Sequence, residues 1–335
     1  MEKRGWAPAS GVPTPTLQAT LTSPPLFCAS GKAVALPLGV IRRGLTTVLT
    51  AILLSACGPF AASPATGTIV VPPPASPQPE PSGLGQQQPN INHIHAVATR
   101  DGGRHLLLGT HKGIDAAVPG GRPQPIPGGP KGDVLQLTYG GGSTFYAAGH
   151  NLGVWVSRDD GATWTEASAD VKGLDVHALA VDPSQRANLF AYAIGKGMLI
   201  STDAGAHWSH RAGFADTNHL TGLTVTGDGT LLGGSPELGI LASPDHGAGF
   251  LPVRNATGQV YSLGSGAQNG DVVLVAAQTG IFLTQDGGKS WSVGDPNIAI
   301  TGVDVDPDDS RHFFAGTADG TLSTSSDGGL TWVAY

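Results

Sequence analysis

Histidines are the residues of this 335-residue sequence best placed to do chemistry. Two of them, His93 and His95, lie two positions apart, and side chains at this spacing on a β-strand point to the same side. Imidazole nitrogens are good ligands for zinc and copper. The pair is therefore a candidate for part of a divalent transition-metal site, provided that the fold brings further histidines to it.

Acidic residues and a tyrosine offer a different chemistry, the hydrolysis of glycosidic bonds. Most glycosidases use two facing carboxylates roughly 5–9.5 Å apart, and some use a tyrosine that a glutamate activates. The weak catalytic candidates here are Glu237, Tyr261 and Asp319. Glu237 and Tyr261, with Arg211 at a nearby strand end, would suit the tyrosine route. Glu237 and Asp319 belong to separate repeats and are expected to lie too far apart for the two-carboxylate route.

A repeated turn indicates which elements must position these side chains. Its pattern is Ser-x-Asp-x-Gly-x-x-Trp, with Thr replacing Ser once and Phe replacing Trp once. The five copies begin at Ser157, Ser201, Ser243, Thr284 and Ser325. Their closing aromatic residues, from Trp164 to Trp332, are separated by 44, 42, 41 and 41 residues. A nearly constant period of this length is typical of a solenoid or a propeller.

The residues between the turns favour a propeller. Residues 175–210 contain four short β-prone segments, VHALAV, LFAYAI, MLIST and HWSH, with turn residues between them and no helical period. Four strands in a period of about 40 residues form one propeller blade. The same order recurs across 92–335, although the first blade lacks the turn motif. We therefore predict an all-β fold, a six-bladed β-propeller that follows a signal peptide and a Pro-rich tether.

The repeated turn has a structural explanation. Its aspartate can accept hydrogen bonds from N–H groups of the same turn, its glycine permits a positive φ, and its aromatic ring can anchor the hairpin on apolar neighbours. We assign this scaffold role, rather than catalysis or metal binding, to the aspartate and the aromatic residue of each turn. These residues are Asp159, Trp164, Asp203, Trp208, Asp245, Phe250, Asp286, Trp291, Asp327 and Trp332.

The turn motif resembles the BNR repeat, or Asp-box, of sialidases, sortilin-type receptors and photosystem II assembly-factor propellers. With the N-terminal features described below, the chain also looks like bacterial lipoproteins labelled BNR-repeat glycosyl hydrolases. The resemblance implies the propeller fold, but the motif serves unrelated activities. Sialidases of this class use an arginine triad, a tyrosine with a glutamate partner and an acid/base aspartate. Their Phe-Arg-Ile-Pro motif is absent here, so the resemblance does not extend to that catalytic set.

One face of the predicted propeller gathers polar residues. Aligned blades share an equivalent position near the start of the innermost strand, and its occupants are His95, Gln136, His177, Thr221, Tyr261 and Thr301. The loops between second and third strands reach the same face, opposite the repeated turns. The histidines expected on this ligand face are His93, His95, His111, His150, His177 and His219. Three interpretations remain open: the polar lining of a wet channel, a ligand site without metal, and a divalent transition-metal site formed by His93, His95 and His111. No other cofactor is expected.

The N-terminal part of the sequence predicts export and a lipid anchor. Residues 40–56 combine basic residues with a short apolar stretch, as a signal peptide does. Leu-Ser-Ala-Cys at 54–57 matches a bacterial lipobox, in which Cys57 would be lipidated. Residues 1–39 precede this signal and are interpreted as a wrongly assigned or extended N-terminus. Residues 57–91 are rich in proline and predict a disordered tether.

Composition and charge narrow the function. A formal net charge of −7 argues against nucleic acid as a partner. We expect a monomer in the bacterial cell envelope, outside the cytoplasmic membrane, that touches the membrane through its lipid anchor only. The expected role is recognition or assembly with an envelope protein or glycan. The alternative is a sialidase-like glycoside hydrolase acting at the ligand face, but the sequence favours a binding protein over an enzyme.

Overall fold

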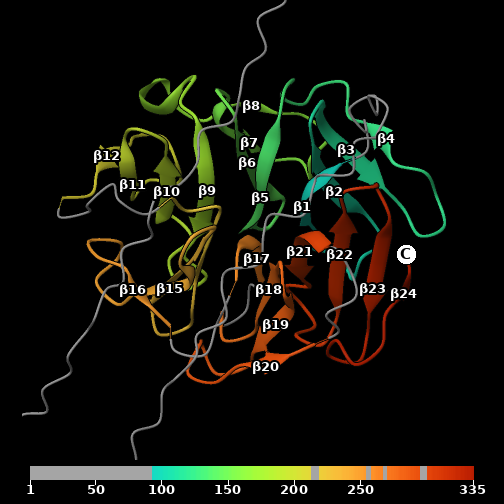
Figure 1. The fold of residues 1–335 in the computed structure, drawn as a ribbon. Coiled ribbons are helices and arrows are strands. Elements are labelled where there is room, and N and C mark those ends of the chain that lie inside the picture. The colour runs from blue at the N-terminus through green and yellow to red at the C-terminus, as the bar shows by residue number, and fades with distance from the viewer. Residues whose placement is uncertain (1–92, 213–218, 254–257, 267–269, 295–299) are drawn as a thin grey trace, which may run out of the picture. The chain divides into compact units, whose positions relative to one another are not determined.

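The computed structural model describes residues 93–335 apart from 213–218, 254–257, 267–269 and 295–299. This part of the chain is all-β, with 24 strands and one 3-10 turn at Ala169–Val171. The strands form six four-stranded antiparallel sheets, which are the blades of a β-propeller (Figure 1). The predicted six-bladed fold is therefore confirmed. The predicted segments 1–39, 40–56 and 57–91 lie outside the described residues, and no helix within the described residues is long and apolar enough to cross a membrane.

Each of the first three blades is built from four consecutive strands. Blade 1 contains β1 (Ile94–Ala98), β2 (Leu106–Thr110), β3 (Gly113–Ala117) and β4 (Gln124–Pro125). Blade 2 contains β5 (Val134–Gly141), β6 (Thr144–Gly149), β7 (Gly153–Ser157) and β8 (Thr165–Glu166). Blade 3 contains β9 (Val176–Val181), β10 (Leu189–Ala193), β11 (Gly197–Ser201) and β12 (Ser209–His210).

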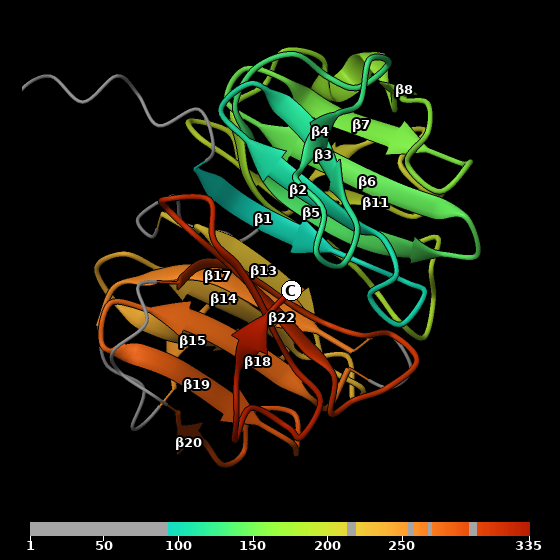
Figure 2. The same cartoon turned by 90° about the vertical axis from the view of Figure 1, so that its right-hand side faces the viewer.

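The last three blades repeat this plan. Blade 4 contains β13 (Gly222–Val225), β14 (Leu231–Ser235), β15 (Gly239–Ser243) and β16 (Leu251–Pro252). Blade 5 contains β17 (Val260–Ser265), β18 (Val273–Ala277), β19 (Gly280–Thr284) and β20 (Ser292–Val293). Blade 6 contains β21 (Ile300–Val305), β22 (Phe313–Thr317), β23 (Leu322–Ser325) and β24 (Val333–Ala334). The first strand of every blade contacts the first strand of both neighbouring blades, and β21 meets β1 to close the ring (Figures 1 and 2).

The hydrophobic core is divided among the six blade interfaces. Strand β10 shows how: alternate side chains point to opposite faces of a sheet. Leu189, Ala191 and Ala193 pack in a cluster with blade 2, whereas Phe190 and Tyr192 pack in a cluster with blade 4. Both faces of such a strand are buried, which explains why it reads as a continuous apolar run and not as an alternation with polar residues.

Side chains, and not a shared sheet, join the last blade to the first. All four strands of each blade are consecutive in the chain, so neither blade 1 nor blade 6 borrows a strand from the other. The Thr301 hydroxyl donates to the Ile94 carbonyl over 2.6 Å, and the Tyr335 hydroxyl donates to the Gly103 carbonyl over 2.7 Å. Phe314, fully buried, fills the apolar cluster between these two blades.

The five repeated turns, which we call boxes and number in chain order, have the internal hydrogen bonds that the sequence predicts. In the first box, Asp159 Oδ1 accepts from the Thr163 N–H over 2.8 Å and from the Ser157 hydroxyl over 2.8 Å. The Gly161 N–H donates to Ser157 Oγ over 2.9 Å, and Gly161 has a φ of +84°. The Trp164 indole N–H donates to the Gly161 carbonyl over 2.9 Å. The four later boxes repeat the bonds of the serine or threonine and of the aspartate.

The aromatic residue of each box packs between its own blade and the preceding one. Trp164 is only 5% exposed and lies in the cluster shared by blades 1 and 2. The corresponding residues of the other boxes are partly buried, and they are Trp208, Phe250, Trp291 and Trp332. The scaffold role predicted for the boxes therefore agrees with the geometry, although burial is complete only at the first of them.

Candidate functional site

A cavity of about 300 Å³ opens where the innermost strands begin, and we call it the mouth cavity. The six positions aligned from the sequence all line it, together with neighbouring residues. Its lining is formed by His93, His95, Leu135, Gln136, His150, His177, Thr221, Gln259, Val260, Tyr261 and Thr301. All six blades thus contribute to one cavity.

Three of these aligned residues fasten the blades to one another. The Gln136 amide donates to the Thr221 carbonyl over 2.9 Å, which links blade 2 to blade 4. The Thr221 hydroxyl donates to the Val260 carbonyl of blade 5 over 2.7 Å. Thr301 makes the equivalent bond from blade 6 to Ile94 of blade 1. Through these bonds the three side chains help to build the wall of the cavity.

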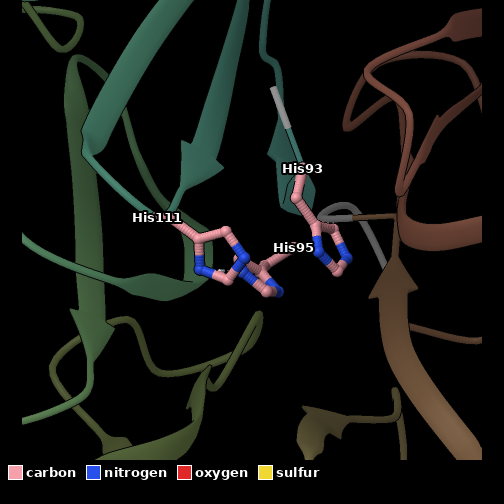
Figure 3. Close-up of side chains that lie close together, drawn as sticks. All are labelled: His93, His95 and His111. Carbon is pink, nitrogen blue, oxygen red and sulfur yellow. Dashed lines mark hydrogen bonds between the residues drawn. The ribbon is translucent and has the colours of Figure 1, made fainter. Parts of the chain in front are cut away.

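The first histidine cluster consists of His93, His95 and His111, and Figure 3 shows their three rings turned toward one another. His93 and His95 stack with ring centroids 4.3 Å apart. His95 Nε2 lies 3.1 Å from His111 Nδ1. His93 and His95 come from the start of β1, and His111 comes from the tight turn between β2 and β3. The fold therefore brings together the three residues that the sequence nominated as metal ligands.

An aspartate that the sequence analysis did not nominate completes this cluster. Asp133, just before β5, places its Oδ1 3.1 Å from His95 Nε2 and 3.1 Å from His111 Nδ1. Its other oxygen, Oδ2, lies 3.8 Å from His150 Nε2. One carboxylate thus faces the first cluster with one oxygen and the histidine of the next blade with the other.

The second histidine cluster consists of His150, Asp175 and His177. His150 Nδ1 lies 2.9 Å from Asp175 Oδ1, and His177 Nε2 lies 3.1 Å from the same oxygen. The two imidazole nitrogens are 3.2 Å apart. His150 comes from the turn between β6 and β7, and the other two residues come from the start of β9.

The sequence contained a signal for both aspartates. Asp175 and His177 are spaced as His93 and His95 are, so the acidic residue stands where blade 1 has its first histidine. Asp133 is harder to find, because it lies three positions before Gln136 and not two. The structure removes the discrepancy, because the residue skipped at the bulge is Leu135 in β5, as it is His95 in β1 and His177 in β9. Gln136, which the sequence alignment placed with His95, is therefore one position off, and Asp133 occupies the same position as His93 and Asp175.

Burial keeps the inner histidines neutral near pH 7. It lowers the pKa of His95 to about 4, and the nearby Asp133 carboxylate offsets this effect only in part. Burial also lowers the pKa of His177, against the opposing influence of Asp175, and it lowers the pKa of His93. A neutral imidazole offers a lone pair, which is the form that binds a metal ion.

The remaining candidates for the ligand face are less concentrated. His219 is exposed, with Nδ1 3.8 Å from Glu237 Oε1, and neither residue lines the mouth cavity. Tyr261 does line it. Asp319 is exposed and accepts the Thr321 N–H of its own turn over 3.1 Å. Glu237 and Asp319 are therefore not brought together in this cavity, and no glycosidase pair is formed there by the described residues.

Arg211 directly follows β12, so it does lie at a strand end as the sequence indicates. Its guanidinium donates to the backbone carbonyls of Asp245 and His246 over 2.7 and 3.1 Å, so the side chain is held against the third box turn, which belongs to blade 4. Arg211 is not among the residues that line the mouth cavity.

The fold and the mouth cavity define an Asp-box type of six-bladed β-propeller with histidine clusters at one end of its channel. No protein-family model matches the sequence. No curated protein matches it either. The similarities found are to solved structures, all at low sequence identity.

PorZ, described as an essential bacterial surface component of the type-IX secretion system of Porphyromonas gingivalis, superimposes with a TM-score of 0.51 at 16% identity. The match covers 72% of this chain and only 32% of PorZ, so the chain spans about a third of that protein. A GH74 enzyme of Niastella koreensis matches with a TM-score of 0.48 at 14% identity, covering 72% of this chain and 47% of the enzyme. YCF48 from Cyanidioschyzon merolae matches with a TM-score of 0.45 at 13% identity, covering 74% and 86%. The likeness to PorZ agrees with the propeller fold.

Proposed function

We propose that this chain is a lipid-anchored protein of the bacterial cell envelope whose propeller serves as a recognition or assembly module. Its partner is an envelope protein or a glycan, which binds at the mouth cavity. In this proposal Cys57 carries the lipid, the Pro-rich segment 57–91 spans the distance to the membrane, and the propeller acts as a monomer. The label of BNR-repeat glycosyl hydrolase then describes the fold and not the activity.

The observation that supports binding over hydrolysis is the chemistry of the mouth cavity. The cavity is open and is lined by imidazole, amide, hydroxyl and apolar groups. No carboxylate is among the described residues that line it, whereas a glycosidase requires an acid/base group and a nucleophile or base beside the scissile bond. Aromatic and polar groups around an apolar wall are typical of a ligand pocket.

Two further points support the surface placement. The lipobox and the tether together form a means of holding a domain away from a membrane. PorZ, which has the same fold, is a bacterial surface component, so such propellers do occur in this setting.

Site-specific photo-crosslinking in the native bacterium tests the proposal. A photoreactive amino acid replaces Tyr261 in the mouth cavity, and a matched control replaces Leu330, which is 83% exposed in the fifth box turn. We expect a discrete adduct from position 261 only. Identical products from both positions, or none from position 261, would argue against a partner at the mouth. Turnover of glycoside substrates that is lost in Glu237→Gln would instead support the hydrolase.

A further inference from the structure

A pair of side chains recurs from blade to blade beside the mouth cavity. In each copy, a histidine in the turn between the second and third strands faces an aspartate just before the first strand of the next blade. His111 Nδ1 faces Asp133 Oδ1 over 3.1 Å, and His150 Nδ1 faces Asp175 Oδ1 over 2.9 Å. The same atoms meet at nearly the same distance, so the two pairs are repeat-related versions of one arrangement.

A third donor atom joins each pair. His95 Nε2 lies 3.1 Å from both atoms of the first pair. His177 Nε2 lies 3.2 Å from His150 Nδ1 and 3.1 Å from Asp175 Oδ1. Each cluster therefore presents two nitrogens and one oxygen at the corners of a nearly equilateral triangle.

Hydrogen bonding alone cannot satisfy these triangles. An ionised carboxylate oxygen only accepts, and one imidazole nitrogen is either a donor or an acceptor. If both nitrogens donate to the oxygen, the two N–H groups face each other. If one nitrogen accepts from the other, its lone pair faces the oxygen. At least one edge of each triangle is therefore repulsive for every choice of protons on neutral rings.

A divalent cation would remove this conflict. Ligands about 2.0–2.1 Å from a tetrahedral ion lie about 3.3 Å apart, and those of an octahedral ion about 2.9 Å apart. The edges of both triangles fall in or beside this range. The donors are imidazole and carboxylate without thiolate, a set that suits zinc, copper(II) or nickel and not calcium or magnesium.

We infer that the wall of the mouth cavity holds two neighbouring divalent transition-metal sites. The first is bound by His95, His111 and Asp133, with His93 as the fourth ligand. The second is bound by His150, Asp175 and His177, and its remaining coordination positions face the cavity. Asp133 connects the sites, since its two oxygens face the first cluster and His150 respectively. This inference goes beyond the proposed binding role and does not depend on it.

The two sites differ in what they can do. Beside its three closely spaced donors the first has His93, a donor nitrogen of which lies within 4.8 Å of those of His95 and His111, and with His93 bound the site would reach the four ligands of a closed tetrahedral site. The second has three, so a water molecule or a group of a bound partner would complete it. Because His150 and His177 line the mouth cavity, such a partner group would reach the ion from the cavity. Carboxylate or imidazole groups are suitable ligands for that position.

Metal stoichiometry of the purified, untagged full-length chain tests the inference. After removal of metal with a chelator, the protein is titrated with Zn²⁺ and with Cu²⁺ by calorimetry, and bound metal is measured after dialysis. We expect two equivalents. His95→Gln and His177→Gln should each lose one equivalent, and the double variant should lose both, with affinity at each site lowered at least about tenfold.

A matched control comes from the box turns. His207 Nδ1 lies 2.7 Å from Asp203 Oδ2 but is 84% exposed, and among the described residues this pair forms no group with a third His, Cys, Asp or Glu donor. His207→Gln should therefore keep both equivalents. Far-UV circular dichroism of the metal-free proteins checks folding, and His111→Gln replaces His95→Gln if the latter does not fold.

Three results would overturn the inference. One is the absence of saturable binding by the wild-type protein. Another is the same stoichiometry in His177→Gln as in His207→Gln. The third is a single equivalent that disappears in either cluster variant, which would mean one shared ion and not two sites. None of these results affects the photo-crosslinking at position 261, so failure of the metal sites and failure of the proposed function are distinguishable.

Discussion

Aspartates of this protein do different work according to their neighbours. In the fifth box, Asp327 accepts the Thr331 hydroxyl over 2.6 Å and the Thr331 N–H over 3.0 Å. These bonds, the hydroxyl first, lower the pKa of Asp327 to about 2. Asp133 instead faces imidazoles that are themselves potential ligands. A box carboxylate thus forms hydrogen bonds within its own turn, whereas the Asp133 carboxylate lies against histidines of other blades.

Acid should destabilise the propeller through the box aspartates. Because the folded-state pKa of Asp327 is lower than its usual value of 3.8, the ionised form contributes stability above pH 4, and this contribution is lost as the pH falls toward 2. Asp327→Asn should therefore lower the thermal midpoint at pH 6, and the difference from wild type should shrink between pH 4 and pH 2. Thermal melts over that range measure it. A difference that is constant with pH would show that ionisation of Asp327 does not stabilise the fold.

The candidate site was predictable at the level of its histidines but not of its carboxylates. His93 and His95 could be found from their spacing, because side chains two residues apart on a strand point to the same side of the sheet. Asp133 and Asp175 stand at the position that His93 has in blade 1, but their role could not be found, since each meets a histidine from the preceding blade, and the sequence does not give distances between blades. Aligning Gln136 with His95, where the structure aligns Leu135, also hid Asp133.

The box hairpin is the element that fastens each blade to the one before it. Its hydrogen bonds fix the turn, and its aromatic ring then reaches across to the preceding blade. Trp164 and Trp208 occupy the same position in successive boxes and make the same indole bond, over 2.9 and 3.0 Å. They differ in burial, since Trp164 is 5% exposed and Trp208 is only partly buried.

Replacing these two tryptophans should separate burial from hydrogen bonding. Trp164→Ala should lower the free energy of unfolding by about 3–5 kcal/mol, as expected for a large buried aromatic residue. Trp208→Ala loses an equivalent indole bond but less buried surface, so its effect should be smaller. Urea denaturation measures both values. Equal losses would mean that the indole bond, and not packing between blades, determines the contribution of a box.

Strands were easier to predict than their lengths. The first three strands of each blade follow from apolar runs bounded by turns, because both of their faces are buried between blades. The outermost strands, by contrast, pair over only two residues and are exposed, as β12 is at Ser209–His210. The sequence HWSH indicates a strand but not how soon its pairing ends.

At the scale of the whole molecule, attachment to the membrane depends on one residue. If Cys57 is lipidated, Cys57→Ala should leave the propeller intact but move it from the membrane fraction to the soluble fraction, or stop its processing. Cell fractionation with an antibody against the propeller measures this, and Cys28→Ala is the matched control, since Cys28 lies outside the lipobox. A Cys57→Ala protein that is processed normally and remains in the membrane fraction would contradict the anchor.

Closure of the propeller ring depends on contacts between residues that are far apart in the chain. Blades 1 and 6 are neighbours in the propeller but are not consecutive in the chain. The hydroxyl of Tyr335 helps to join them, because it donates to the Gly103 and Ala117 carbonyls over 2.7 and 3.3 Å. Its ring also meets Phe314 edge-on, with centroids 6.1 Å apart. Burial raises the pKa of Tyr335 to about 12, in keeping with a hydroxyl that stays protonated and donates.

Tyr335→Phe should weaken the closure of the propeller while keeping the aromatic side chain at position 335. Loss of the hydroxyl should lower the free energy of unfolding by about 1 kcal/mol. Hydrogen exchange should become faster in β1 and β21 before it does in β9 and β13, because blades 1 and 6 are neighbours that are not consecutive in the chain. Tyr139→Phe is the control, since that hydroxyl donates to Gly142 within its own hairpin over 3.2 Å and joins no two blades. Urea denaturation and hydrogen exchange measure the two effects. If exchange rises equally in all innermost strands, or if Tyr139→Phe produces the same pattern, the junction of blades 1 and 6 is not the place where this propeller opens.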